Sequence, residues 1–123
     1  MDTGKKRGML ITRESDGVLV VYFTVNSLVF PNDIESAGRE LMKLLEETSS
    51  LRVALEMSAL KQISSGFVSK LLLFSRQLGM RGGKLVLCGM SPQVDQVFKI
   101  LRLQKILTTV KDEYEAVNKL LEE

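Results

Sequence analysis

Histidine is absent from the 123-residue chain, and cysteine occurs once, at Cys88. Without histidine there is no Ser-His or Cys-His nucleophile pair, and the commonest general base of enzymes is missing. A single cysteine excludes an internal disulfide and, together with the lack of histidine, argues strongly against a structural zinc site. We expect Cys88, within the apolar run LVLCGM, to be a small core residue.

The chain also lacks a strong charge bias and a long hydrophobic run. The net charge of +2 is too small to predict binding to nucleic acid or to an anionic membrane. No run reaches the roughly 18 apolar residues of a membrane helix, and residues 1–17 contain no signal-peptide core, so we expect a cytoplasmic protein. Residues 1–8, with the basic run Lys5-Lys6-Arg7, read as a flexible tail, and residues 9–123 read as one domain.

Strands rich in β-branched residues alternate with segments of helical periodicity. Asp16-Gly17 is a hairpin turn signal between the first two predicted strands. Strands are predicted at 9–13, 18–25, 52–57, Lys84–Cys88 and 107–110. Helices are predicted from Asn32 or Asp33 to 48, from Ser64 or Ser65 to 79, from Pro92 to 101 and from Asp112 to 121. The order β-β-α-β-α-β-α-β-α predicts an α/β single domain with crossover helices, a mostly parallel sheet and an antiparallel edge.

Two short stretches resemble catalytic or phosphate-binding motifs but lack the residues that these motifs require. GMRGGK would need glycine at position 78 and a hydroxyl at position 85 to form a phosphate-binding loop, and those residues are Leu78 and Leu85. SALK, from Ser58 to Lys61, matches a serine-nucleophile motif but lacks every companion motif. No set of base, nucleophile and oxyanion donor can be assembled, so we expect a protein that is not an enzyme and has no cofactor or metal.

The stretch QISSGFVSKLLL, residues 62–73, leaves two interpretations open. Ser64 or Ser65 could simply cap a helix, a role worth roughly 1 kcal/mol. Alternatively, a hydroxyl at the carboxyl end of a buried strand and at the positive end of a helix dipole is well placed as a site. Gly66 would let a partner backbone or a kinase approach closely.

Three segments in this order resemble the STAS domains, typified by bacterial anti-sigma factor antagonists. They are VALEMSALKQISSG, RGGKLVLCGMSPQVDQVF and LRLQKILTTVKDEYEAV, and the likeness covers about residues 9–121. The family pattern is a strand ending in an acid, then Asp-Ser-[Ser/Thr]-Gly opening a helix, then Gly-Gly, a strand and Ser-Pro. Gly82-Gly83 and Ser91-Pro92 fit that pattern well.

The resemblance implies a binding module for an anti-sigma factor that is also a serine kinase. Phosphorylation of the first motif serine, which adds about −2 charge, would break the complex. Carried over, the phosphoacceptor is Ser64, and the partner-binding residues are Ile63, Ser64, Ser65, Gly66 and Ser69. No nucleic acid and no membrane insertion are implied.

Two positions depart from the family pattern. Ile63 replaces the acid before the first serine, and the stretch TVNSLVF has Asn26 and no carboxylate. Ile63 would make the motif surface more apolar, which favours an alternative within the family: a constitutive, non-phosphorylated scaffold or a transporter-associated subunit. A third reading, a small-molecule sensor or enzyme with an apolar pocket beside the helix start, is disfavoured by the lack of converging polar residues.

Overall fold

The computed structural model describes residues 5–122, and residues 1–4 and 123 lie outside this range. The elements in chain order are β1 (Lys5–Arg7), β2 (Leu10–Ser15), β3 (Val18–Phe23), β4 (Ser27–Leu28), α1 (Pro31–Glu47), β5 (Arg52–Glu56), β6 (Gln62–Ile63), α2 (Ser65–Met80), β7 (Lys84–Cys88), α3 (Pro92–Ile100), the 3-10 helix η1 (Leu103–Lys105), β8 (Thr108–Val110) and α4 (Glu113–Leu121). A six-stranded sheet has the order β1-β2-β3-β5-β7-β8, and β4 and β6 form a separate pair. The predicted α/β class is confirmed.

The sheet is antiparallel at its N-terminal edge and parallel from β3 onward. Asp16 and Gly17 join β2 to β3 with φ values of 55° and 81°, the left-handed pair that a two-residue hairpin turn requires. Strand β1, at residues 5–7, pairs with β2, so this part of the predicted tail is a strand, and the part of that prediction that concerns residues 1–4 lies outside the described residues. Strand pairing uses main-chain groups, so a polar edge strand gives no hydropathy signal.

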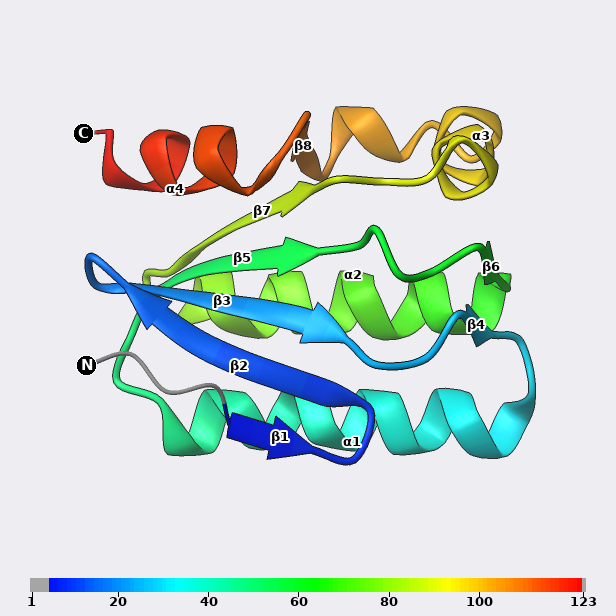
Figure 1. Cartoon of the computed structure of the whole chain (residues 1–123), viewed down its shortest axis with the longest axis horizontal. Coiled ribbons are helices and arrows are strands. Elements are labelled where there is room, and N and C mark those ends of the chain that lie inside the picture. Colours follow the sequence, from blue (N-terminus) through cyan, green and yellow to red (C-terminus); the bar gives the residue numbers. More distant parts are fainter. Residues whose placement is uncertain (1–4, 123) are drawn as a thin grey trace.

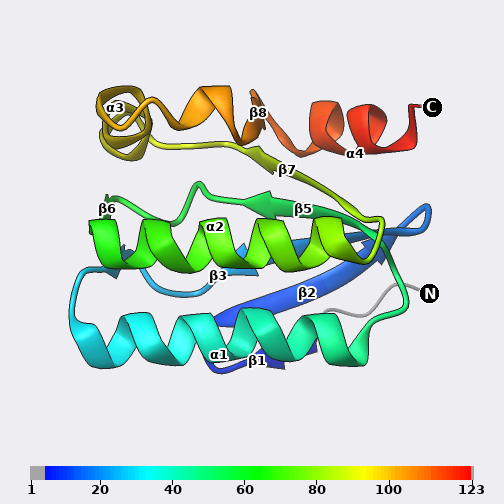
Figure 2. The ribbon, with the colours of Figure 1, turned by 180° about the vertical axis from the view of Figure 1, so that it is seen from behind.

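Helices cover the two faces of the sheet unequally (Figures 1 and 2). Helices α1 and α2 lie side by side across one face, and α3 contributes Val94 and Phe98 to the same core. Helix α4 covers the opposite face, where Ala116 and Leu120 pack against residues of β3, β5 and β7. Within residues 5–122, no helix is long and apolar enough to cross a membrane.

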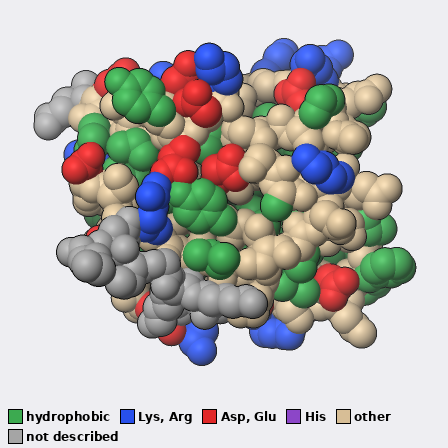
Figure 3. Space-filling model, viewed as in Figure 1, with side chains coloured by type: hydrophobic (Ala, Val, Ile, Leu, Met, Phe, Trp, Pro, Cys, Tyr) green, Lys and Arg blue, Asp and Glu red, His purple; other side chains and the backbone are tan. Residues whose placement is uncertain are grey.

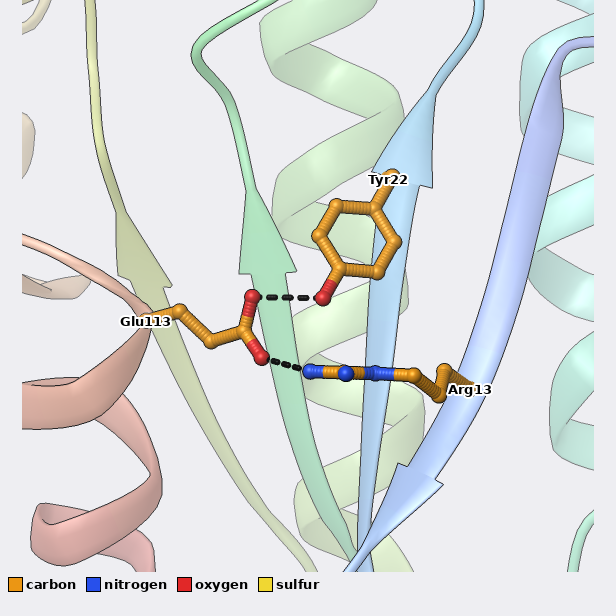
Figure 4. Close-up of polar contacts among 3 residues, drawn as sticks. All are labelled: Arg13, Tyr22 and Glu113. Atoms are coloured by element: carbon orange, nitrogen blue, oxygen red, sulfur yellow. Dashed lines mark hydrogen bonds and ion pairs between the residues drawn. The ribbon is translucent and has the colours of Figure 1, made fainter. Parts of the chain in front are cut away.

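A polar cluster ties the start of α4 to the β2–β3 hairpin (Figure 4). The Glu113 carboxylate accepts a hydrogen bond from the Tyr22 hydroxyl at 2.5 Å and pairs with the Arg13 guanidinium. Burial, and next the hydrogen bond to Glu113, raises the pKa of Tyr22 above its ordinary value. Tyr22 therefore stays a neutral donor and helps to fix α4 on the sheet.

Parallel strands β5 and β7 bring the starts of α2 and α3 to the same edge of the sheet. Each of these helices follows a buried strand through a short loop, and α3 also contacts β6. Figure 1 shows β4, β6, α3 and the start of α1 gathered at that edge. The carboxyl ends of parallel strands are where α/β proteins place their sites.

Candidate functional site at the start of helix α2

The loop between β5 and β6 is held by buried side chains. Met57 and Leu60 are fully buried, and the Leu60 amide donates to the Met57 carbonyl at 3.0 Å. The Leu60 carbonyl in turn accepts a 2.9 Å hydrogen bond from the buried hydroxyl of Ser91, at the start of α3. The loop leading to Ser64 is therefore anchored both to the core and to the next helix.

A second segment lies directly beside the motif. Strand β4 runs parallel to β6, with Leu28 opposite Ile63, and the Ser64 amide donates to the Leu28 carbonyl at 3.1 Å. The Asn26 carbonyl accepts from the Lys61 amide at 2.7 Å. The two positions that lack the family's carboxylates, Asn26 and Ile63, thus lie on adjoining segments of one short ladder.

Ser64 occupies the N-cap position of α2 without using its hydroxyl as a cap. Its backbone is extended, with φ −107° and ψ 168°, and its side chain makes no capping hydrogen bond. The Ser64 carbonyl accepts from the amides of Phe67 and Val68, each at 3.1 Å, so the backbone alone starts the helix. Ser64 is half-buried and Ser65 is exposed, as expected for a hydroxyl pair at the surface of the site.

Gly66 is exposed, but its surroundings leave little room for a side chain. A Cβ atom there would lie 3.3 Å from Ile34 Cδ1 of α1 and 3.5 Å from Ser64 Oγ. The contact with Ile34 would force that side chain to shift by a few tenths of an ångström, whereas the contact with Ser64 Oγ would be an ordinary van der Waals contact. Glycine therefore leaves the packing of α2 against Ile34 of α1 undisturbed.

Ile63 does not contribute the apolar surface that the sequence suggested. Its side chain is 9% exposed and belongs to the main core, opposite Leu28. The expectation that Ile63 makes the motif surface more apolar is therefore wrong, because alternation along β6 turns this residue inward and Gln62 outward. A role for Ile63 in partner binding stays a prediction.

Other side chains around the helix start have defined partners. Ser69 is exposed, and its hydroxyl donates to the Ser65 carbonyl at 3.2 Å. Lys70 of α2 pairs with Glu35 of α1 at 3.0 Å beside a groove of about 420 Å³ between the two helices. Within residues 5–122, no group of three or more His, Cys, Asp or Glu side chains is arranged to hold a metal ion.

Two exposed apolar residues near Ser64 were not singled out from the sequence. Val29 is 40% exposed and Phe30 is 67% exposed. They directly follow Leu28, whose carbonyl binds the Ser64 amide, so they flank the helix start. The sequence does not indicate that these two residues are exposed, because SLVF has the apolar composition of a buried strand. Their exposure follows only from the parallel β4–β6 pairing, which ends at Leu28.

A family model described as the STAS domain matches residues 9–116. The chain belongs to the STAS domain family. No curated protein sequence matches the chain. The exposed helix start described above therefore lies within the matched STAS domain.

Several solved structures share this fold at low sequence identity. An anti-sigma factor antagonist from Mycobacterium paratuberculosis has a TM-score of 0.80 at 15% identity, covering 92% of this chain and 93% of that one. RsbS of Moorella thermoacetica, in a serine-to-glutamate form, has a TM-score of 0.73 at 19% identity and coverages of 90% and 93%. The anti-sigma factor antagonist SpoIIAA in its unphosphorylated form has a TM-score of 0.64 at 15% identity, with coverages of 97% and 96%.

Proposed function

We propose that this STAS protein is a cytoplasmic regulatory module that acts as an anti-sigma factor antagonist. It binds an anti-sigma factor that is also a serine kinase, through the surface formed by Ser64, Ser65, Gly66 and Ser69 together with the exposed Val29 and Phe30. Phosphorylation of Ser64 ends the complex. The module acts by binding and carries out no catalysis itself.

The observation that carries this proposal is the state of the Ser64 hydroxyl. A serine at an N-cap normally accepts a hydrogen bond from the first turn, and Ser64 does not. Its oxygen is therefore not committed to holding the helix, and Ser65 and Gly66 beside it are exposed. Membership in the STAS family and the likeness to the unphosphorylated form of SpoIIAA support the same assignment.

A phosphoryl group on Ser64 would act differently in the free protein and in the complex. In the free protein, about −2 charge would sit at the positive end of the α2 dipole, which is favourable. In the complex, the same charge would be desolvated among apolar contacts made by Val29 and Phe30, which are 40% and 67% exposed in the free chain. The difference between the two environments is what would release the partner.

A second candidate within the family is a constitutive binder, such as a scaffold or a transporter-associated subunit. One structural observation favours it: the two missing carboxylates fall on the adjoining Asn26 and Ile63 segments. A kinase that brings a metal-bound nucleotide to Ser64 would meet no carboxylate at Asn26 or Ile63 that could contact the metal. This candidate keeps the same binding surface and removes only the phosphorylation switch.

The test uses a protein with a histidine-kinase-like ATP-binding fold, sought first among the proteins encoded by the neighbouring genes. That protein is incubated with ATP and with wild type, Ser64→Ala or Ser65→Ala, and intact masses are measured. We expect wild type and Ser65→Ala to gain one phosphoryl group and Ser64→Ala to gain none. A complex that forms without any mass gain would establish the constitutive binder. Absence of any complex would reject both candidates.

A further inference from the structure

Exposed aliphatic side chains gather where α3 ends and η1 begins. Ile100, Leu101 and Ile106 are 70%, 45% and 64% exposed. Phe98 and Leu103, which lie in the same short stretch, are buried in the main core and hold the other side of the stretch against the sheet. Figures 1 and 2 both place α3 and η1 at the outer border of the molecule. The aliphatic side chains therefore face solvent at an outer corner of the fold.

Basic side chains lie among these aliphatic residues. Arg102 and Lys105 are exposed, and within residues 5–122 neither side chain makes an ion pair or a hydrogen bond. Figure 3 shows Lys and Arg side chains gathered at the border of the molecule over α3 and η1. We call the following five residues the basic corner: Ile100, Leu101, Arg102, Lys105 and Ile106.

Carboxylates are scarce around the basic corner. Residues 96–111 include no Asp or Glu, and neither does α2, which packs on the same face of the sheet. The acid of α3, Asp95, forms an ion pair with Lys99 at 3.0 Å. Figure 2 shows α2 between the corner and the acidic residues of α1, and α4 packs on the opposite face. The net charge of +2 describes the whole chain and so conceals this local excess of positive charge.

Arg102 has a backbone conformation that normally selects glycine. Its φ of 57° and ψ of 37° are left-handed, and it directly follows Leu101, the C-cap residue of α3. Glycine is the usual residue at this position and asparagine the next, because a Cβ atom adds strain there. The Arg102 side chain has no partner among the described residues that would offset this strain. A strained residue with an exposed, unpaired side chain points to a role outside the folded chain.

We propose that the basic corner binds the surface of an anionic lipid bilayer. Ile100, Leu101 and Ile106 enter the boundary between headgroups and acyl chains, and the charged groups of Arg102 and Lys105 contact lipid phosphates. The long stems of both cations lie along the aliphatic side chains while their charged ends stay at the level of the headgroups. The contact is peripheral, since no helix within residues 5–122 is long and apolar enough to cross a membrane.

The chemistry of the corner favours a lipid surface over a protein partner. Protein interfaces concentrate their binding energy in aromatic and arginine side chains that fill pockets on the partner. The exposed apolar residues of the corner are all aliphatic, and they lie at the border of the molecule. A bilayer requires no shape-matched pocket, only aliphatic area combined with positive charge. The inference does not depend on the proposed function, because Ser64 lies at the start of α2 and not at this corner.

The test is sedimentation of the full chain with lipid vesicles. One vesicle type is phosphatidylcholine alone, and the other is equal parts of phosphatidylcholine and phosphatidylserine. Wild type is expected to bind the mixed vesicles at millimolar lipid, to bind phosphatidylcholine alone at least about 10-fold more weakly, and to be released by added salt. The variant Arg102→Glu with Lys105→Glu is expected to bind the mixed vesicles at least about 10-fold more weakly than wild type.

Two further variants separate the aliphatic contribution from the charge. Ile100→Ser with Ile106→Ser removes aliphatic area and is expected to weaken binding to the mixed vesicles by roughly 10-fold. Arg102→Gly removes one charge and relieves the left-handed strain, so we expect weaker binding together with a higher temperature of unfolding. If Arg102 served only the fold, the same variant would unfold at a lower temperature and bind as wild type does.

The matched control is Arg39→Glu with Lys43→Glu, the same charge reversal on the exposed side of α1. It is expected to bind the mixed vesicles as wild type does, and circular dichroism checks that all variants fold. A wild type that stays in solution with the mixed vesicles at low salt overturns the proposal, even if the corner then binds an acidic polypeptide such as polyglutamate. Equal binding to both vesicle types overturns it as well, and so does an equal loss of binding in the control.

Discussion

Helices α2 and α3 both begin with a serine at the N-cap and lie at the same edge of the sheet. The Ser91 side chain is 5% exposed; its oxygen accepts from the Val94 amide at 3.3 Å and its hydroxyl donates to the Leu60 carbonyl at 2.9 Å. The Ser64 side chain is half-buried and makes no capping hydrogen bond. Serine at the N-cap therefore has a hydrogen-bonded hydroxyl at the start of α3 and a hydroxyl without a capping bond at the start of α2.

This difference separates a serine whose hydroxyl is used in the fold from one whose hydroxyl makes no capping hydrogen bond. Ser91 supplies a cap and satisfies a buried carbonyl in the loop that leads to Ser64, so its hydroxyl contributes to stability. Ser64 leaves its oxygen available to an external reagent at a surface built from three chain segments. Ser91 also acts on the candidate site indirectly, because it holds the loop in front of the motif.

The largest expected contrast is in thiol reactivity. Burial, and next the Glu56 carboxylate, raises the pKa of Cys88 from 9.0 to about 12, so its thiol stays protonated below that pH. In the variant Ser64→Cys, the new thiol should react with a disulfide reagent at pH 8 at least about 1,000-fold faster than Cys88. Between about pH 7 and 9 the rate of the new thiol should rise and then level off as the thiol ionises, while Cys88, which is 0% exposed, should stay far slower throughout.

The control for this contrast is Ser91→Cys, in which both thiols should react slowly in the folded protein. Stopped-flow or timed absorbance of the released reagent measures both rates. If Ser64→Cys is labelled as slowly as Ser91→Cys, the start of α2 is as inaccessible to the reagent as the start of α3.

The next effect is on stability at α3. Ser91→Ala removes the acceptor for Val94 and leaves the Leu60 carbonyl without its donor, so we expect the free energy of unfolding to fall by about 1–3 kcal/mol. Urea unfolding measures this loss. The matched control is Ser69→Ala on an exposed face, which should change stability by less than about 0.5 kcal/mol.

Charge at position 64 should affect binding more than folding. Ser64→Asp places an acid at the positive end of α2, which should leave the free energy of unfolding unchanged or slightly raised. Affinity for the proposed partner, an anti-sigma factor with kinase activity, should fall by roughly 10-fold or more when measured by calorimetry. Ser49→Asp, on an exposed loop after α1, is the control and should bind as wild type does. Unchanged affinity of Ser64→Asp would argue against the charge switch.

The smallest effect is expected for Ser64→Ala. Because the hydroxyl makes no capping bond, its removal should change the free energy of unfolding by less than about 0.5 kcal/mol. This value is read from the same urea titrations as Ser91→Ala. A loss of about 1 kcal/mol or more would mean that the hydroxyl caps α2 in solution, and that the two helix starts are alike.

The long, periodic elements were predictable because each carries its own signal. The helices at α1, α2, α3 and α4 and the strands at β5 and β7 match their patterns within a few residues, as do the Asp16-Gly17 turn and the Asp112 cap, which accepts from the Glu115 amide at 2.9 Å. Strands β1, β4 and β6 were missed. Each is two or three residues long, and each exists only because a partner strand offers main-chain groups.

The sequence motif predicted where the candidate site lies in the chain, but it did not predict which of the neighbouring side chains are buried and which are exposed. The positions of Ser64, Ser65 and Gly66 at the start of α2 follow from the cap and strand signals. The inward turn of Ile63 depends on pairing with β4, which no local pattern indicates. The exposure of Phe30 likewise depends on where β4 ends.

The sequence by itself determined the alternation of strands and helices, because apolar periodicity and turn residues act within a few positions of the chain. It also determined the absence of histidine chemistry. Only the tertiary structure decided which N-cap serine has its hydroxyl bonded and which leaves it available, since the Leu60 carbonyl that binds Ser91 comes from a residue 31 positions away. Hydrogen bonds between distant segments form only when the whole sheet has placed them, so a serine's role at a helix start cannot be read from its neighbours in sequence.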